Sequence, residues 1–169
     1  MLRGSVNTAL LSSFLLLFAF IIIMSTDYLF YLIPNAVLIF MLAPGLYRSI
    51  QLGVSLLSNI FIALGAVLLL TLLTRHFEAR KQKQIIGYGD IKLIGVLFLL
   101  YPVWATTVGI WFSAALSLMV FPFLKIFQKR FSNERKIPFG FFLSVVFLVI
   151  EFFKLQYKIE SLFSNFLSI

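Results

Sequence analysis

Two aspartates are the side chains in this sequence best suited to carry out chemistry. Asp27 and Asp90 are its only aspartates, and each lies where an apolar segment meets a polar one. A charged side chain in or at the rim of a membrane span costs about 2.5–3.5 kcal/mol on insertion scales, so it usually persists because it has a function. Two such carboxylates brought together can share a proton and activate a water molecule.

The composition predicts that the elements holding these aspartates are membrane helices. Hydrophobic residues make up 62% of the 169 residues and charged residues only 12%, whereas soluble domains are about 25% charged. We therefore predict an all-α, polytopic membrane protein, a bundle of about six transmembrane helices in a single membrane-embedded domain over residues 1–169. Apolar runs place the spans near 6–26, 29–47, 52–74, 91–101, 103–124 and 137–153.

Proline shortens two of these spans, and both adjoin an aspartate. Pro34 disfavours helical backbone at the residue before it, and Pro102 limits the fourth span to residues 91–101, about 17 Å against a bilayer core of about 30 Å. Irregular backbone at membrane depth is tolerated where protein or a water-filled cavity satisfies its polar groups, which predicts water access near the pair. Apolar residues after Ile150 recur at helical spacing, so we predict an interfacial tail helix over 154–169, with a longer sixth span as the alternative.

The distribution of lysine and arginine predicts the orientation. Ten of the 14 basic residues lie in two loops: Arg75, Arg80, Lys81, Lys83 and Lys92 between spans three and four, and Lys125, Lys129, Arg130, Arg135 and Lys136 between spans five and six. The positive-inside rule places both loops in the cytoplasm and both termini outside. Span one then delivers Asp27 to the face where Asp90 begins span four. The net charge of +8 reflects this topology, and no nucleic-acid partner is predicted.

Missing residue types exclude several other chemistries. The chain has no cysteine, which excludes disulfides and thiolate metal sites. Its one histidine, His76, leaves no His-Glu-x-x-His zinc site, and its charged surroundings indicate a solvated loop residue. We therefore predict neither a metal nor a cofactor. A Ser25 and Lys92 pair remains an alternative nucleophile and base, although nothing in the spacing favours it.

The residues around Asp90 fit a dyad that cleaves peptide bonds. Gly87 and Gly89 permit close approach of an extended substrate. A structural alternative is that Asp90 only caps a helix beginning at Ile91. Lys92 is expected either to reach the lipid headgroups or to bias the dyad electrostatically.

Three ordered segments resemble those of a known family, the bacterial type IV prepilin peptidases, which are Gly-x-Gly-Asp intramembrane aspartic proteases. They are Asp27 followed by Ile33-Pro34-Asn35, then Gly87-Tyr88-Gly89-Asp90-Ile91-Lys92, and Pro138-Phe139-Gly140 at the start of the last span. The resemblance implies that Asp27 and Asp90 are catalytic and that Gly87, Gly89 and Lys92 form the active-site loop. It makes Pro34, Asn35, Pro138 and Gly140 candidates for structural or substrate-channel residues.

The resemblance also implies a substrate and a location. The partners would be prepilin or pseudopilin precursor helices and the lipid bilayer, and a short basic leader would be cleaved at the cytoplasmic face of a bacterial inner membrane. Two departures stand out: Tyr28-Leu29-Phe30-Tyr31-Leu32 replaces the usual basic residues, and Phe141 stands where many members have proline. Without Cys-x-x-Cys motifs, the chain resembles the short, peptidase-only form, and no N-methyltransferase activity is expected. The alternative is a non-catalytic transporter or assembly component of a secretion or pilus machine, with the aspartates binding an ion or a proton.

Overall fold

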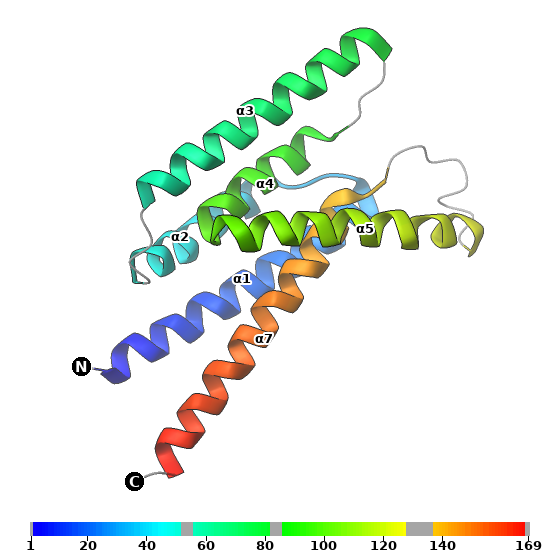
Figure 1. Cartoon of the computed structure of the whole chain (residues 1–169). Coiled ribbons are helices and arrows are strands. Elements are labelled where there is room, and N and C mark those ends of the chain that lie inside the picture. Colours follow the sequence, from blue (N-terminus) through cyan, green and yellow to red (C-terminus); the bar gives the residue numbers. More distant parts are fainter. Residues whose placement is uncertain (1, 52–55, 82–85, 128–136, 168–169) are drawn as a thin grey trace.

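The computed structural model describes residues 2–51, 56–81, 86–127 and 137–167. Every regular element in these ranges is an α-helix, which confirms the predicted all-α fold class. The helices shown in Figure 1 are α1 (Leu2–Phe30), α2 (Asn35–Gln51), α3 (Leu56–Lys81), α4 (Tyr88–Leu100), α5 (Val103–Phe127) and α7 (Phe139–Leu167).

Three of these helices are long and apolar enough to cross a membrane. The qualifying segments are Leu10–Phe30 in α1, Leu57–Arg80 in α3 and Val103–Val120 in α5. The chain is therefore a membrane protein. The length and apolar character of these helices support three of the six predicted crossings. The apolar part of α2 is shorter, and the 13 residues of α4 extend only about 20 Å, less than the bilayer core of about 30 Å.

The second predicted span, 29–47, starts too early. Helix α1 continues through Phe30, and α2 begins at Asn35. Tyr31 leaves the helical region with a φ of 54°, and Pro34 has no N–H for a helical hydrogen bond. The carbonyl of Pro34 instead accepts the N–H of Val37 at 3.1 Å, so the proline starts α2, and the predicted break before it is confirmed.

The last helix is longer than predicted. Residues 154–167 continue α7 without interruption, so the separate tail helix predicted over 154–169 is wrong for the described residues, and residues 168 and 169 lie outside them. No glycine or proline occurs between Phe141 and Leu167, so nothing in the sequence breaks the helix. The longer sixth element, weighed as the alternative, is what forms.

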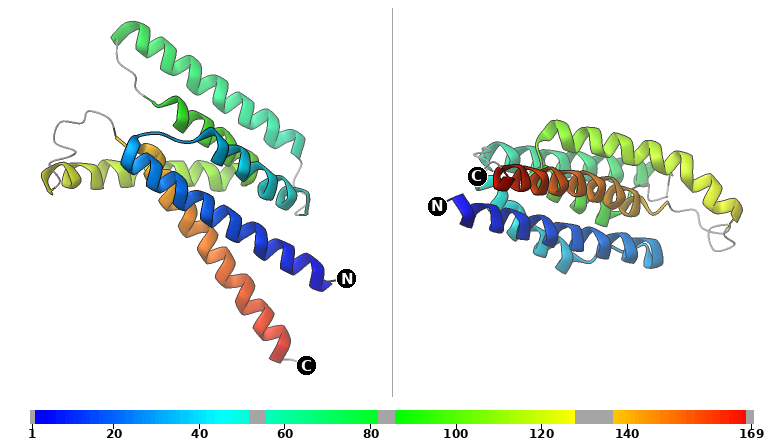
Figure 2. Two further views of the ribbon diagram at one scale, coloured as in Figure 1. Left: turned by 180° about the vertical axis from the view of Figure 1, so that it is seen from behind. Right: turned by 90° about the horizontal axis from the view of Figure 1, so that it is seen from below.

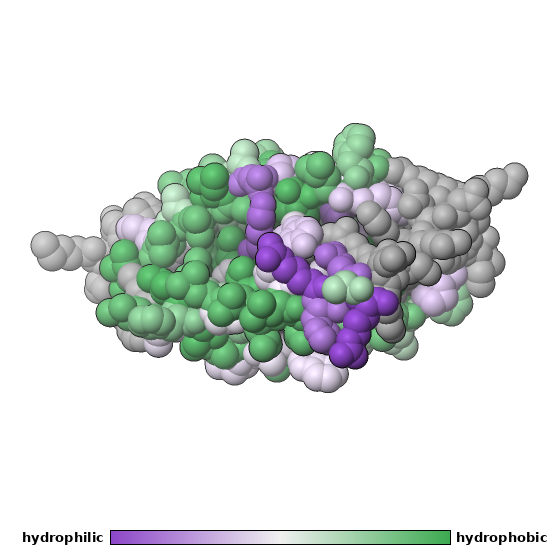
Figure 3. All heavy atoms as spheres, turned by 90° about the horizontal axis from the view of Figure 1, so that it is seen from above, coloured by the Kyte–Doolittle hydropathy of each residue, from purple (hydrophilic) through white to green (hydrophobic). Residues whose placement is uncertain are grey.

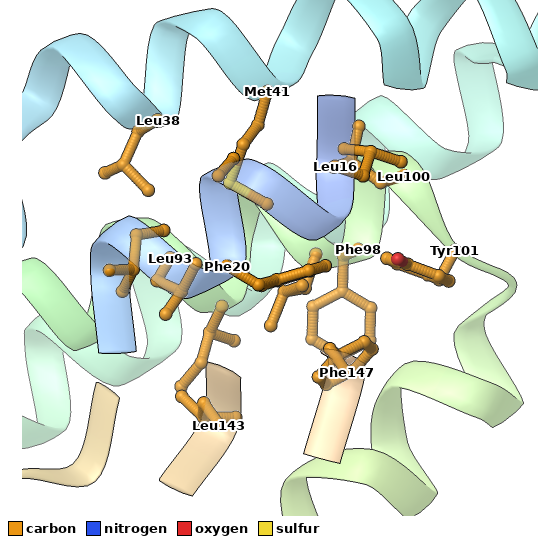
Figure 4. Close-up of a cluster of buried hydrophobic side chains, with 14 of the residues drawn as sticks. Leu16, Phe20, Leu38, Met41, Leu93, Phe98, Leu100, Tyr101, Leu143 and Phe147 are labelled. Atoms are coloured by element: carbon orange, nitrogen blue, oxygen red, sulfur yellow. The ribbon is translucent and has the colours of Figure 1, made fainter. Parts of the chain in front are cut away.

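The helices pack around one hydrophobic core. Helix α1 packs along α7 and α2, α4 packs against α3 and α2, and α5 packs against α7. Figure 4 shows side chains from α1, α2, α4 and α7 meeting in the interior, where the rings of Phe20 and Phe147 stack with centroids 6.1 Å apart. Many large apolar side chains of α3 point outward, as expected of a surface in contact with lipid; they include Leu64, Leu68, Leu69 and Leu72.

Four helix ends converge at one end of the bundle. Helix α1 finishes there, and α2, α4 and α7 start there, while α1 starts and α7 ends at the opposite end (Figure 2). The two aspartates therefore lie at the same end, as the predicted topology requires.

One face of the bundle carries a hydrophilic patch. Figure 3 shows this patch next to hydrophobic residues on the face viewed. Arg75, His76 and Arg80, in the last turns of α3, are exposed. His76 was predicted to be a solvated loop residue, but α3 continues to Lys81, so the loop part of that prediction is wrong. Five of the predicted cytoplasmic basic residues lie outside the described residues: Lys83, Lys129, Arg130, Arg135 and Lys136.

Candidate active site

Asp27 lies in the last turns of α1 and is buried. Its side chain is only 5% exposed, and its backbone carbonyl accepts the N–H of Tyr31 at 2.9 Å, where α1 ends. The carboxylate faces the start of α7, and its Oδ2 accepts the backbone N–H of Phe141 at 2.7 Å. Gly140 also lies against this carboxylate, since a Cβ atom at Gly140 would be 3.1 Å from Oδ2 of Asp27. The first N–H groups of a helix have no partner within it and carry the positive end of its dipole, so α7 presents to Asp27 the donors that a carboxylate needs.

Asp90 is the third residue of α4, because this helix begins at Tyr88 and not at Ile91. Its carboxylate lies against Gly87, the residue before the helix, and against Gly140 in α7, because a Cβ atom at either position would lie 3.0 Å from one of the carboxylate oxygens. Gly87, and not Asp90, is the residue that caps this helix, so the predicted role of Asp90 as the cap of a helix beginning at Ile91 is wrong. The Asp90 carboxylate instead faces Gly140 in α7.

Gly140 brings the two carboxylates together. A Cβ atom at this position would lie 3.0 Å from Oδ1 of Asp90 and 3.1 Å from Oδ2 of Asp27. The two oxygens are therefore separated by no more than the sum of these distances. A side chain at position 140 would compete with both oxygens for the same space, so this close approach requires glycine.

The environment of Asp90 favours its protonated form. Asp90 lies outside the three candidate spans, at the start of a short helix. Burial raises the pKa of its carboxyl, and the neighbouring Asp27 carboxylate raises it further, from 3.8 to about 7, while the amides of Gly140 and Gly87 oppose the change. At neutral pH the pair can thus hold one proton, as an acid and base dyad requires.

The Ile33-Pro34-Asn35 segment is attached to the Asp90 loop. Lys92 Nζ donates to Oδ1 of Asn35 at 3.1 Å. Ile33 lies against Gly89, where a Cβ would be 3.2 Å from the Cβ of Ile33, and against Gly140. The predictions for Lys92 were headgroup contact or an electrostatic effect on the dyad, whereas the structure shows a hydrogen bond between two sequence motifs.

The structure brings the predicted site residues together at one end of the bundle, with different roles. Asp27, Asp90, Gly87 and Gly140 form the carboxylate cluster. Gly89, Lys92 and Asn35 form the contacts beside it. Pro34 starts α2, and the buried Pro138 directly precedes α7.

Sequence reasoning missed the backbone donors at the start of α7. Pro138 and Gly140 were interpreted as a helix start and a close-packing residue, which they are, but Phe141 received no role. Because α7 starts beside Asp27, the N–H of Phe141 donates a hydrogen bond to the carboxylate. A proline at this position, as many prepilin peptidases have, would lack that N–H. The signal available in the sequence was the predicted start of a helix next to a glycine, because the first N–H groups of a helix have no partner within it.

Neither the serine and lysine pair nor a metal centre has a matching site in the part of the chain that the structure describes. Ser25 Oγ donates to the carbonyl of Ile21 at 2.8 Å, while Lys92 bonds to Asn35, so each member of the alternative pair has another partner. Among the described residues, no group of three or more His, Asp or Glu side chains is arranged to hold a metal ion.

Comparison of the chain with protein-family models, with curated proteins and with solved structures gives no match.

Proposed function

We propose that the chain is a membrane aspartic endopeptidase. The observation that carries this proposal is that Asp27 and Asp90, from two helices far apart in the sequence, both reach Gly140 at the start of α7. Buried carboxylates are costly unless hydrogen-bonded or protonated, and here backbone amides and a shared proton offset that cost. Such a pair can activate water for peptide hydrolysis.

The geometry supports a division of roles between the two carboxyl groups. Asp27 accepts the N–H of Phe141 in α7 and is suited to the ionised role, in which it takes a proton from the attacking water. Asp90, with its raised pKa, donates its proton to the oxygen of the scissile carbonyl. When the tetrahedral intermediate collapses, the proton held by Asp27 passes to the leaving amine, and Asp90 recovers a proton from the hydroxyl group formed at the former carbonyl.

The substrate class rests on the resemblance of the three motifs to those of prepilin peptidases. We propose that the substrates are prepilin or pseudopilin precursors, cleaved after a short basic leader at the cytoplasmic face of a bacterial inner membrane. The position of the aspartates at one end of the bundle suits a cleavage site just outside an apolar helix. It also suits the predicted orientation, in which exposed basic residues such as Arg75 and Arg80 at the end of α3 face the cytoplasm.

A reconstituted cleavage assay tests this proposal. The purified protein in liposomes is mixed with a peptide that carries a basic leader followed by an apolar helix, and the products are identified by mass spectrometry. We expect a single cut at the leader junction. Leader peptides that stay intact beside a folded protein would contradict the proposal. Proton or cation uptake into the same liposomes, without cleavage, would instead support the transporter alternative.

A further inference from the structure

A buried polar pair joins the end of α4, which carries Asp90, to the middle of α7, which carries Gly140. Tyr101 directly follows α4 and is 1% exposed, and Glu151 in α7 is fully buried. The hydroxyl of Tyr101 donates to Oε1 of Glu151 at 2.8 Å, and Figure 4 shows Tyr101 at the edge of the core beside Phe147. The proposed cleavage mechanism uses neither residue.

The pair is partly charge-compensated from within α7. Lys154 Nζ lies 3.9 Å from Oε1 of Glu151 and 4.5 Å from the centre of the Tyr101 ring. A buried carboxylate is costly unless it is paired and hydrogen-bonded. An apolar residue at position 151 would avoid that cost. A glutamate at this position therefore indicates a role beyond packing.

The spacing of the pair matches that of the active site. Asp90 and Tyr101 are 11 positions apart (101 minus 90), and so are Gly140 and Glu151 (151 minus 140), which is about three turns of helix. Asp90 lies against Gly140 at the starts of α4 and α7, and Tyr101 donates to Glu151 three turns later. Two helices running in the same direction are thus joined at matched heights.

Helix α4 makes few direct contacts with α7. Helix α4 packs chiefly against α3 and α2 and touches α7 much less. It is also short, with 13 residues. A hydrogen bond between buried groups tolerates only a few tenths of an ångström of change, whereas a slide by one residue moves a helix by about 1.5 Å. The Tyr101 and Glu151 bond can therefore set the axial register of α4 against α7.

We propose that Tyr101 and Glu151 are positioning residues that hold Asp90 at the height of the Gly140 amide. The inference rests on the proposed function, because the register matters to catalysis only if the dyad is the active site. A displacement of about 1 Å at reacting groups can lower the rate about 100-fold. We therefore expect Glu151→Leu and Tyr101→Phe each to lower kcat by about 100-fold, with KM changed by no more than a few fold.

Two further variants separate register from general stability. Glu151→Gln retains an oxygen that accepts the Tyr101 hydroxyl, and it should keep kcat within a few fold of wild type. Leu143→Ala removes fully buried packing from α7 and leaves the Tyr101 and Glu151 bond in place. It should lower the unfolding temperature in detergent but change kcat by no more than a few fold.

A distance measurement detects the register without any substrate. The chain has no cysteine, so spin labels can be attached only at introduced thiols. Suitable positions are Tyr88 at the start of α4 and Val149 in α7, which are exposed and offset along the bundle. In the Glu151→Leu background we expect the label distance to shift or broaden by about 1–2 Å, and in the Glu151→Gln background we expect it to stay unchanged.

The outcomes distinguish the two proposals. A kcat loss together with a shifted distance for Glu151→Leu, restored by Glu151→Gln, supports the register role. A wild-type kcat, or an unchanged distance distribution in Glu151→Leu, overturns it. If the wild-type protein cleaves no leader peptide, the proposed function fails, and the distance measurement alone then decides whether Tyr101 and Glu151 set the register.

Discussion

Gly140→Ala is the most informative single change at the candidate site, because one added methyl group meets both aspartates. The new Cβ would lie 3.0 Å from Asp90 Oδ1 and 3.1 Å from Asp27 Oδ2, short of the 3.4 Å at which ordinary van der Waals contact begins. It would also lie 2.6 Å from Cδ1 of Ile33, a terminal methyl group that can rotate away. Asp27 is held by the N–H of Phe141, yet both carboxylates would have to move by a few tenths of an ångström.

The expected effect is opposite to the usual result of this substitution. Replacing glycine by alanine within a helix normally stabilises a protein by about 0.5–1 kcal/mol, whereas overpacking a tight site costs about 1–3 kcal/mol. The net result at Gly140 is a loss of up to about 2 kcal/mol of stability. Because the reaction rate falls steeply when the reacting groups are displaced, we expect kcat to fall by about 100-fold.

Gly65→Ala in α3 is a matched control. A Cβ at Gly65 would meet nothing within 4 Å, so this variant should be as stable as wild type or more so, with unchanged kcat. Cleavage of a leader peptide and thermal unfolding in detergent measure both effects. If Gly140→Ala keeps wild-type kcat, the carboxylates do not need the space that the glycine leaves, and the reasoning about the site is refuted.

Three further predictions concern the residues around the dyad. Activity should fall as pH rises through about 7, because Asp90, whose pKa is raised to that value by burial and by Asp27, then loses the proton it must donate; a flat pH–kcat profile from 6 to 8.5 would contradict this. Lys92→Ala and Asn35→Ala should each lower stability, and in a double-mutant cycle their coupling should be about 0.5–1.5 kcal/mol, since Lys92 Nζ donates to Asn35; strict additivity would show that the bond contributes nothing. Phe141→Pro removes the N–H that Asp27 accepts, at a position where a helix tolerates proline. Activity should then fall most at acidic pH, because Asp27 must stay ionised there without this hydrogen bond. Phe141→Leu keeps the N–H and should retain the wild-type pH profile.

The sequence predicted the fold class and the proximity of the two aspartates for physical reasons. A chain with 12% charged residues cannot form an ordinary soluble surface, so membrane helices follow from composition. Having only two aspartates, both at the ends of apolar segments, restricted the search to a single pair. Alternating membrane crossings then placed both on one side, and the structure has them at one end of the bundle beside Gly140.

The contacts that complete the site were not predictable from the sequence. The N–H of Phe141 and the hydrogen bond between Lys92 and Asn35 join segments far apart in the chain, and no local pattern specifies such distances. The early end predicted for α1 failed because apolar Leu29 and Phe30 extend the helix until Tyr31 adopts a positive φ. Tertiary packing decided these details.

Measuring kcat for Asp27→Asn, Asp90→Asn and the double variant on one leader peptide tests the central claim most directly. Asparagine keeps the shape of aspartate but can neither take nor give the required proton. We expect each single variant to lose about 100- to 10,000-fold in kcat and the double variant to be no worse than the poorer single one, because the two groups act as a unit. Wild-type cleavage by either folded single variant would show that Asp27 and Asp90 are not a catalytic pair.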